Sequence, residues 1–423
     1  MRIAVVGAGV SGLVAARLLN GRHDVTVFEA NDYVGGHTHT VHVELDDAEL
    51  DVDTGFIVYN EQNYPLFTAL LRELEVATQP SPMSFSVSRE PAGIEYRATS
   101  FGTLFAQRAN LLRPSFHRML VDIARFNRAA RAVLEQGDEH SSLDDLLARG
   151  RFSRELRDHF VVPLGSSIWS ADPAHFGEMP AMTYARFMAN HGLLSFGAQP
   201  LWRTVTGGAH HYVRRLLRDL DGRVRSGAPV ERIERRDDGV ELVAQGHDAE
   251  LFDAVVVATH ADEALAMLVD ATPDERSVLG AIGFQPNTAT LHTDSTMMPR
   301  NRRAWASWNY HLVDDAAGQA TLTYYMNALQ SLTTRHDVLV TLNREDAIDP
   351  SCVVASFSYH HPVLDAGAVA AQRRRSEIQG RRNTYFCGAY WEYGFHEDGV
   401  RSAYDVAALL GHRHSSSVLG APR

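Results

Sequence analysis

Residues 3–29, IAVVGAGVSGLVAARLLNGRHDVTVFE, decide the fold of this chain. The short apolar run over 2–6 is typical of a buried parallel strand that stops at a glycine. Apolar residues then recur at helical spacing over 11–19, and a second strand over 23–29 ends at Glu29. The order of strand, helix and strand predicts a βαβ unit.

The turn between the first strand and the helix has the spacing GxGxxG. Gly7 permits a tight turn, Gly9 lets the backbone approach a pyrophosphate, and Gly12 lets helix and strand pack closely. The helix that Ser11 opens directs free N–H groups and a positive dipole end at that group. Glu29 is placed to accept hydrogen bonds from a ribose, which disfavours a 2′-phosphate and hence NADP. The stretch predicts dinucleotide binding.

A second motif follows in residues 31–41, NDYVGGHTHTV, and in the acidic-x-Gly element that ends at Gly55. With Gly35 and Gly36, it resembles the extended fingerprint of the amine oxidase and phytoene desaturase superfamily, within the glutathione-reductase class. That resemblance implies FAD as the cofactor. Members usually carry arginine after the paired glycines, whereas this chain has His37, which weakens the phosphate contact expected there.

The third motif is C-terminal, in residues 386–407, FCGAYWEYGFHEDGVRSAYDVA. In the superfamily, a strand that ends in glycine leads here to a helix whose N-terminus points at the flavin pyrimidine ring. Such a helix end would stabilise the anionic reduced flavin. The resemblance assigns further cofactor contacts to Gly388, Asp398, Gly399 and Val400, and a backbone contact with adenine to Val230. Cys387 is interpreted as a buried structural thiol, so we expect noncovalent FAD.

Two further strings, DTGFIVYNEQNYP (53–65) and GFHEDG (394–399), resemble a bacterial group of flavin-containing oxidoreductases. These are often encoded beside cyclopropane-fatty-acid-synthase-type methyltransferases, and the resemblance covers almost the whole chain. It implies dehydrogenation or desaturation of a methyl-branched or cyclopropanated fatty acyl chain by hydride transfer to flavin N5. It also implies a methyltransferase as a partner.

Two alternatives stay open. The first is a flavin amine oxidase that produces hydrogen peroxide. Amine oxidases of the superfamily typically hold a lysine that bridges through water to flavin N5, whereas all 40 basic Lys and Arg positions of this chain are arginine. The second is a non-catalytic, flavin-bound partner of a lipid methyltransferase.

Candidate active-site residues come from two places. The segment after the acidic-x-Gly element supplies Tyr59 and Asn60, and the turn over 390–396 supplies Tyr390, Tyr393 and His396. In the superfamily, aromatic residues of that turn flank the substrate. With an unperturbed pKa of about 6.5, His396 is the natural proton acceptor. The competing interpretation is that these aromatic residues pack the junction between domains.

The chain is predicted to have two interleaved domains. A Rossmann-like α/β FAD-binding domain comprises residues 1–60, 200–285 and 376–423, and a mixed α+β substrate-binding domain comprises 61–199 and 286–375. A net charge of −12 and a pI of about 5.9 argue against nucleic acid as a partner. The histidines and the two cysteines have no metal-site spacing, so no metal is expected.

Targeting features point to the cytoplasm. The first strand begins almost at once, so no signal peptide is expected, and no apolar run reaches transmembrane length. The helix expected over 114–136 is amphipathic and basic. One interpretation is that its arginines face water while its apolar stripe covers the substrate domain. The other is that it rests on anionic lipid headgroups, as a peripheral contact at the inner face of the membrane.

Overall fold

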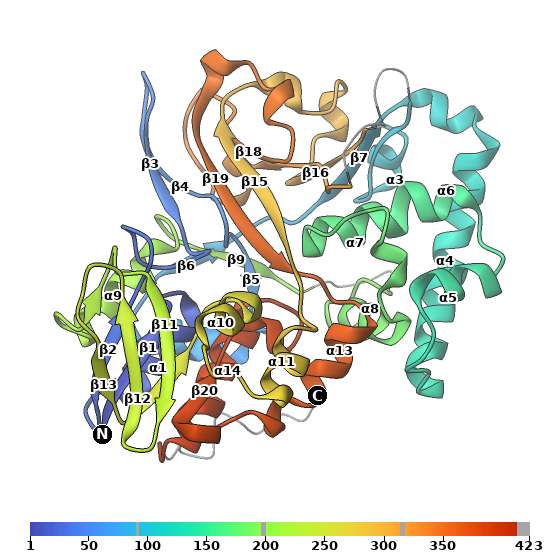
Figure 1. Cartoon of the computed structure of the whole chain (residues 1–423). Coiled ribbons are helices and arrows are strands. Elements are labelled where there is room, and N and C mark those ends of the chain that lie inside the picture. Colours follow the sequence, from blue (N-terminus) through green and yellow to red (C-terminus); the bar gives the residue numbers. More distant parts are fainter. Residues whose placement is uncertain (90–92, 196–199, 314–317, 413–423) are drawn as a thin grey trace.

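The computed structural model describes residues 1–89, 93–195, 200–313 and 318–412. Two large sheets organise the chain, one low and one high in Figure 1. The first is a five-stranded parallel sheet whose order is β10 (Val224–Arg225), β2 (Asp24–Phe28), β1 (Arg2–Val6), β14 (Ala254–Val257) and β20 (Thr384–Phe386). Three distant segments of the chain therefore build one Rossmann-like sheet.

Each face of this parallel sheet is covered. On β1, Ile3 and Val5 point to one face, and Ala4 and Val6 to the other, as period-two alternation requires. The first face carries α1 (Val10–Leu19), α2 (Pro65–Glu73), α9 (His210–Asp219) and α14 (His396–Leu409). The second carries α10 (Ala261–Met267), α11 (Pro273–Leu279), α13 (Ala366–Arg373) and the antiparallel strands β11 (Val230–Arg236), β12 (Gly239–Ala244) and β13 (Glu250–Phe252).

The position of α2 differs from the expectation that segment 61–199 packs with the substrate domain. Its apolar residues Leu66 and Leu70 belong to the core between the parallel sheet and α14. The reason is partly electrostatic, because the carboxylate of Glu397 on α14 accepts the backbone N–H groups of Leu66 and Phe67 at 3.0–3.2 Å. These are the donors that the first turn of a helix leaves without partners.

The second sheet has seven strands and draws on both remaining segments. Its order is β19 (Val353–Pro362), β15 (Phe284–His292), β18 (Leu339–Leu342), β17 (Leu322–Tyr325), β16 (Trp308–Leu312), β7 (Phe85–Arg89) and β8 (Glu95–Arg97). All pairs are antiparallel except β16 with β7. Strands β7 and β8 come from the segment 61–199, where the short, serine- and proline-rich region around β7 has no clear strand pattern in its sequence.

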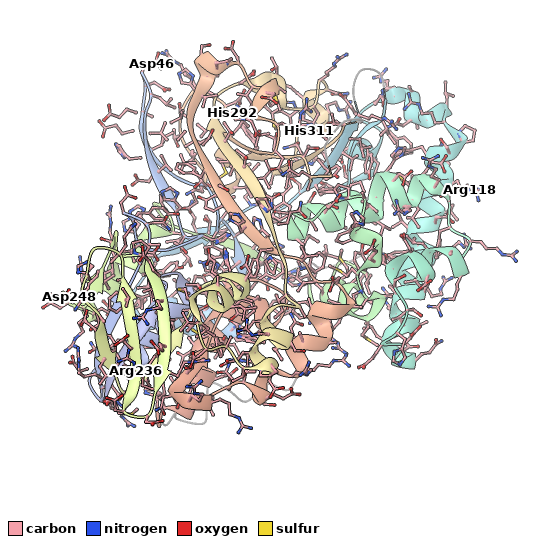
Figure 2. The ribbon with its side chains drawn as sticks, viewed as in Figure 1. Asp46, Arg118, Arg236, Asp248, His292 and His311 are labelled. Carbon is pink, nitrogen blue, oxygen red and sulfur yellow. The ribbon has the colours of Figure 1, made fainter. Side chains whose placement is uncertain are left out.

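A chain of buried side chains crosses this sheet. Hydrogen bonds join His292 to Thr341 (2.7 Å), Thr341 to Thr323 (2.8 Å), Thr323 to His311 (2.9 Å) and His311 to Ser88 (3.2 Å), over five adjacent strands. Figure 2 labels both histidines in the upper sheet. Burial lowers the pKa of His292 to about 4 and that of His311 to about 3, so both are neutral. Partners of this kind meet in one register only, which specifies the strand pairing.

Helices fill the lobe at the right of Figure 1. They are α3 (Phe101–Leu104), the short 3-10 helix η1 (Arg108–Leu112), α4 (Pro114–Gln136), α5 (Leu143–Arg149), α6 (Arg154–Leu156), α7 (Val162–Trp169) and α8 (Ala181–Asn190). The bounds of α4 confirm the helix expected over 114–136, and its buried stripe includes Phe116, Met119, Ile123 and Phe126. Among the described residues, no helix has both the length and the apolar character that a membrane crossing needs.

Small sheets and one short helix complete the fold. Strands β3 (Thr40–Glu44) and β4 (Glu49–Asp53) form a hairpin that turns at Asp46 and Asp47. The strands β5 (Tyr59–Asn60), β9 (Trp202–Val205) and β6 (Thr78–Pro80) form a three-stranded sheet, and α12 (Met326–Leu329) follows β17.

Candidate cofactor-binding and active site

The glycine-rich turn leaves open space at the N-terminus of α1. A Cβ atom at Gly12 would lie 1.9 Å from the carbonyl oxygen of Gly7, so helix and strand are in direct contact there. At Gly9, by contrast, a Cβ would meet no atom within 4 Å. No side chain caps α1, so its first N–H groups face this space. The arrangement is that of an anion-binding helix end.

Glu29 holds the turn from the end of β2. Its Oε2 accepts the N–H of Ala8 at 2.8 Å, and its Oε1 accepts the N–H of Asn31 at 2.9 Å. The side chain is only 6% exposed. Oε1 also accepts the side-chain amide of Asn31 at 3.0 Å, whereas Oε2 keeps a second lone pair and can accept a ribose hydroxyl. The start of β11 lies nearby, because the N–H of Ala228 donates to the Glu29 carbonyl at 2.9 Å, and this places Val230 beside the same loop.

The second glycine motif packs directly on the first. The N–H of Gly35 donates to the Ala8 carbonyl at 3.0 Å, and a Cβ at Gly36 would lie 3.1 Å from the Cα of Gly9. Gly55 passes so close to the loop after them that a Cβ there would lie 2.3 Å from the carbonyl oxygen of His37. Three glycine-containing segments, distant in sequence, thus form one continuous backbone cradle.

The helix α14 begins beside α1. A Cβ at Gly399 would lie 2.8 Å from Ser11 Oγ, so the two N-termini are in contact. Asp398 shapes the turn before α14, because its carboxylate accepts the N–H groups of Tyr393 (3.2 Å) and Phe395 (3.0 Å). That turn is further held by the hydrogen bond from Gly388 N–H to Ser402 Oγ at 2.9 Å, while Val400 is fully buried.

His396 is the first residue of α14 and lies in a buried cluster. Its Nε2 is 3.0 Å from Thr38 Oγ1 and 3.1 Å from the hydroxyl of Tyr212, and those two hydroxyls bond each other. The ring stacks on Phe56 with 3.6 Å between ring centroids. Burial lowers the pKa of His396 to about 3. Such a weak base argues against the proton-acceptor role expected from the sequence and favours a positioning role.

His37 occupies the place expected for arginine and has histidines as neighbours. Its ring centroid is 6.1 Å from that of His260, 5.3 Å from that of His361 and 5.1 Å from that of Tyr359. Burial lowers the pKa of His37 and of His260 to about 4, and that of His361 well below its ordinary value. These rings are therefore neutral at pH 7 and supply hydrogen bonds rather than positive charge.

The turn before α14 meets the helical lobe through aromatic side chains. The indole N–H of Trp169 donates to the Tyr393 carbonyl at 3.1 Å. The ring of Phe187 stacks on Phe395 at 5.1 Å and lies 4.6 Å from Trp169. Tyr393 itself contacts Phe187 at 5.7 Å. The predicted aromatic residues of this turn thus stand where the two structural units touch.

The other predicted active-site residues are embedded in packing. Tyr59 is 2% exposed and packs edge-on against Phe67 in the core that also holds α1 and α14. Asn60 accepts the N–H of Asn63 at 2.9 Å, and Tyr390 packs against Trp391 on the opposite face of the parallel sheet. The structure therefore separates Tyr59 and Tyr390 from each other and gives both a core environment.

Thr38 and Tyr212 are site residues that sequence reasoning missed. Thr38 follows the paired glycines closely, but nothing in the sequence links it to Tyr212 or to His396, which come from distant helices. Cys387 is fully buried, and burial raises the pKa of its thiol to about 12, so it supplies no thiolate for flavin attachment.

Two other features lie apart from this cradle. Within the described residues, Asp46, Asp47 and His336 are an exposed group with metal-ligand chemistry, but these side chains bind one another and the neighbouring Arg335. A cavity of about 280 Å³ lies beside the start of α4, and Arg113, Phe116 and His159 are among the residues that line it. None of the residues that line this cavity is predicted to contact the cofactor.

The glycine cradle and the N-termini of α1 and α14 converge on one space, an arrangement typical of cofactor-binding sites in flavoproteins. The sequence profile of the family described as "Flavin containing amine oxidoreductase" matches residues 10–309. The chain belongs to this family of flavin-dependent oxidoreductases. Membership implies a flavin cofactor.

One curated relative matches more than two thirds of this chain. The carotenoid phi-ring synthase of Streptomyces griseus is 28% identical over 315 residues, which cover 69% of this chain and 57% of that protein. The chain spans about half the length of the curated relatives it matches.

Solved structures share the fold at low sequence identity. Cyclohexylamine oxidase from Brevibacterium oxydans IH-35A is 18% identical with a TM-score of 0.68, and a CLA-producing fatty acid isomerase from P. acnes is 17% identical with a TM-score of 0.70. Each match covers 97% of this chain and 98% of the other.

Proposed function

We propose that this chain is an FAD-dependent oxidoreductase that dehydrogenates or desaturates a fatty acyl chain, such as that of a methyl-branched or cyclopropanated lipid. The observation that carries the choice of substrate is the uncharged character of the site. His37, His260 and His361 are neutral at pH 7 because burial depresses each pKa. The contact between the turn before α14 and the helical lobe is likewise uncharged, because it is built of aromatic rings. Walls of this kind suit an apolar chain better than an ammonium group.

The cradle supports noncovalent FAD through three sets of groups. The N–H groups at the start of α1 would hold the diphosphate, and Glu29 would accept the ribose hydroxyls. The N-terminus of α14 would face the flavin ring and favour its reduced, anionic form. When bound, FAD supplies the electron acceptor for oxidation of a C–H bond. The buried thiol of Cys387 supports noncovalent attachment.

The protein residues contribute position and the exclusion of water. Trp169, Phe187 and Phe395 would hold an acyl chain and keep the reacting carbon dry. His396 would act as a positioning residue, since its hydrogen bonds with Thr38 and Tyr212 tie α14 to the glycine loop. The names of two similar proteins, a fatty acid isomerase and a carotenoid ring synthase, support apolar substrates.

An amine oxidase is the second candidate, because cyclohexylamine oxidase shares this fold. The absence of lysine from the sequence speaks against the usual water-bridging lysine of that class. The methyltransferase association remains a prediction, which co-purification from the native host would test. A chain that only served as a flavin-bound partner would co-purify and would not be reduced by any lipid.

The decisive experiment mixes the purified protein, without oxygen, with a panel of phospholipids, fatty acids, monoamines and polyamines. We expect the visible flavin absorption to bleach with acyl lipids and to persist with amines. Bleaching by amines, with peroxide release in air, would establish the second candidate. Acid precipitation should release the whole cofactor, and mass spectrometry of the supernatant should identify it as FAD.

A further inference from the structure

The outer edge formed by η1 and the first half of α4, residues 108–128, exposes apolar side chains. Leu112 is 88% exposed, Leu111 is 47% exposed, and Val121 is 61% exposed on the same helix face as the outward-pointing Arg118. In Figure 2, Arg118 extends from α4 at the right-hand edge of the molecule. We call residues 108–128 the η1–α4 edge. Adjacent exposed leucines are unusual on a surface that meets only water.

The same edge is strongly basic within an acidic chain. Residues 108–128 contain five arginines and one aspartate, a net charge of +4, whereas the whole chain carries −12. The aspartate, Asp122, is 2% exposed and already binds Arg125, so it does not face outward. Arg108, Arg118 and Arg128 are exposed. The arginines are therefore the charged side chains of residues 108–128 that face outward.

We propose that the η1–α4 edge docks on the surface of an anionic phospholipid bilayer. Leu111 and Leu112 would enter the acyl region while the surrounding arginines bind headgroup phosphates, because apolar insertion and charge attraction together give peripheral membrane binding. Guanidinium groups pair with phosphate oxygens in a bidentate manner. A nucleic acid would use the arginines but would leave the two leucines without a role.

The side of the molecule opposite α4 supplies a control surface. The three-stranded sheet of β11, β12 and β13 lies on the far side from α4 in Figure 1. Its Leu251 is 40% exposed and so offers a matched control for the leucines of the edge. The inference is independent of the proposed reaction, because vesicle binding is measured without turnover.

The test is co-sedimentation of the full-length, flavin-loaded protein with two kinds of vesicle, pure phosphatidylcholine and an equimolar mixture of phosphatidylcholine and phosphatidylglycerol. We expect binding to the anionic vesicles at low salt, a marked decrease at high salt, and little binding to the neutral vesicles. Failure of the wild-type protein to sediment with the anionic vesicles would overturn the proposal.

Two double variants distinguish the contribution of leucine insertion to vesicle binding from that of the arginine charges. The double variant Leu111→Ser/Leu112→Ser should bind anionic vesicles about tenfold more weakly or worse, and Arg108→Glu/Arg118→Glu should also lose about tenfold or more. Leu251→Ser should bind as the wild type does. Unchanged near-ultraviolet circular dichroism and flavin content would verify the fold of each variant.

Two results with these variants would contradict the proposal. Full vesicle binding by the leucine variant would mean that the edge does not insert and serves only as a polyanion site. A wild-type dimer in solution that the leucine variant dissociates would assign the edge to a second copy of the chain.

Discussion

Gly399 of α14 touches Ser11 of α1, with room for no larger residue: a Cβ at position 399 would lie 2.8 Å from Ser11 Oγ and 2.9 Å from Val10 Cγ1. This contact places the N-termini of two helices side by side. One would hold the diphosphate of FAD and the other would face its ring, so the spacing of Gly399 and Ser11 sets the distance between the two ends of the cofactor site.

The variant Gly399→Ala should therefore separate the two helices. We expect a loss of about 1–3 kcal/mol in the free energy of unfolding, as for other overpacked contacts, together with a lower flavin content. Chemical denaturation and the ratio of visible to ultraviolet absorbance would measure both. Normal stability with full flavin would show that the helices are not in fixed contact.

Substitution of Gly9 should separate cofactor binding from stability. An alanine there would meet no protein atom within 4 Å, but its methyl group would enter the space proposed for the diphosphate. Gly9→Ala should unfold like the wild type and bind FAD about tenfold more weakly or worse, since charge-assisted hydrogen bonds are worth roughly 1.5–3 kcal/mol each.

Gly283→Ala is the control for Gly9→Ala, because its added Cβ also meets nothing within 4 Å and the position lies outside the cradle. It should change neither stability nor flavin affinity. Equal flavin binding by Gly9→Ala and the wild type in isothermal titration of the deflavinated protein would contradict the cradle.

His396 should act by position and not by titration. The variant His396→Gln can still bond Thr38 and Tyr212, and we expect it to retain flavin and most of kcat with an unchanged pH profile. His396→Ala removes both hydrogen bonds and should lower kcat and flavin affinity together. An acidic limb of the kcat profile that is present in the wild type and absent from His396→Gln would restore the base assignment.

Acid should destabilise the fold through its buried histidines. His292 and His311 have pKa values of about 4 and about 3 in the folded protein, below the unfolded value of 6.5. The unfolded chain therefore binds more protons, and each histidine costs about 1.4 kcal/mol of stability per pH unit as the pH falls below 6.5. Urea denaturation across this pH range measures the effect.

Two carboxyl groups act in the opposite sense. The pKa of Asp53 and that of Glu397 are raised to about 7 by burial, so their stabilising contribution is present at low pH and is lost as the pH rises toward 7.

The variant His311→Gln isolates the contribution of one histidine. Its free energy of unfolding should fall less steeply as the pH is lowered, because its unfolded state takes up about one proton fewer than that of the wild type. Parallel curves for the variant and the wild type would refute the assigned pKa of His311.

Local sequence signals predicted the first strand, helix and strand and the close packing of their glycines, but not the polar contacts around them. Gly7, Gly9 and Gly12 are informative because a tight turn and a close helix contact each require glycine at a fixed spacing. The hydrogen bond between Thr38 and Tyr212 has no such signal, since it depends on how α9 packs against the glycine loop. Small polar residues such as Thr38 give the weakest sequence signal for the contacts that they make in the folded chain.

The seven-stranded sheet also contains contacts that local sequence signals do not predict. Thr323 and Thr341 are ordinary strand residues in sequence, and only the pairing of five strands turns them into links between His292 and His311. The packing of helix α2 against the parallel sheet is hard to predict from the sequence for a related reason. Its packing depends on the carboxylate of Glu397, which is more than 300 residues away along the chain.

The central claim is tested most directly by a single anaerobic turnover followed by mass analysis of the lipid. The protein is mixed with a limiting amount of a phospholipid that bears methyl-branched or cyclopropanated acyl chains. The account predicts that each flavin reduced is matched by one acyl chain that has lost two hydrogens. A flavin that stays oxidised with every lipid and is reduced by an amine, with the corresponding imine or aldehyde as product, would contradict it.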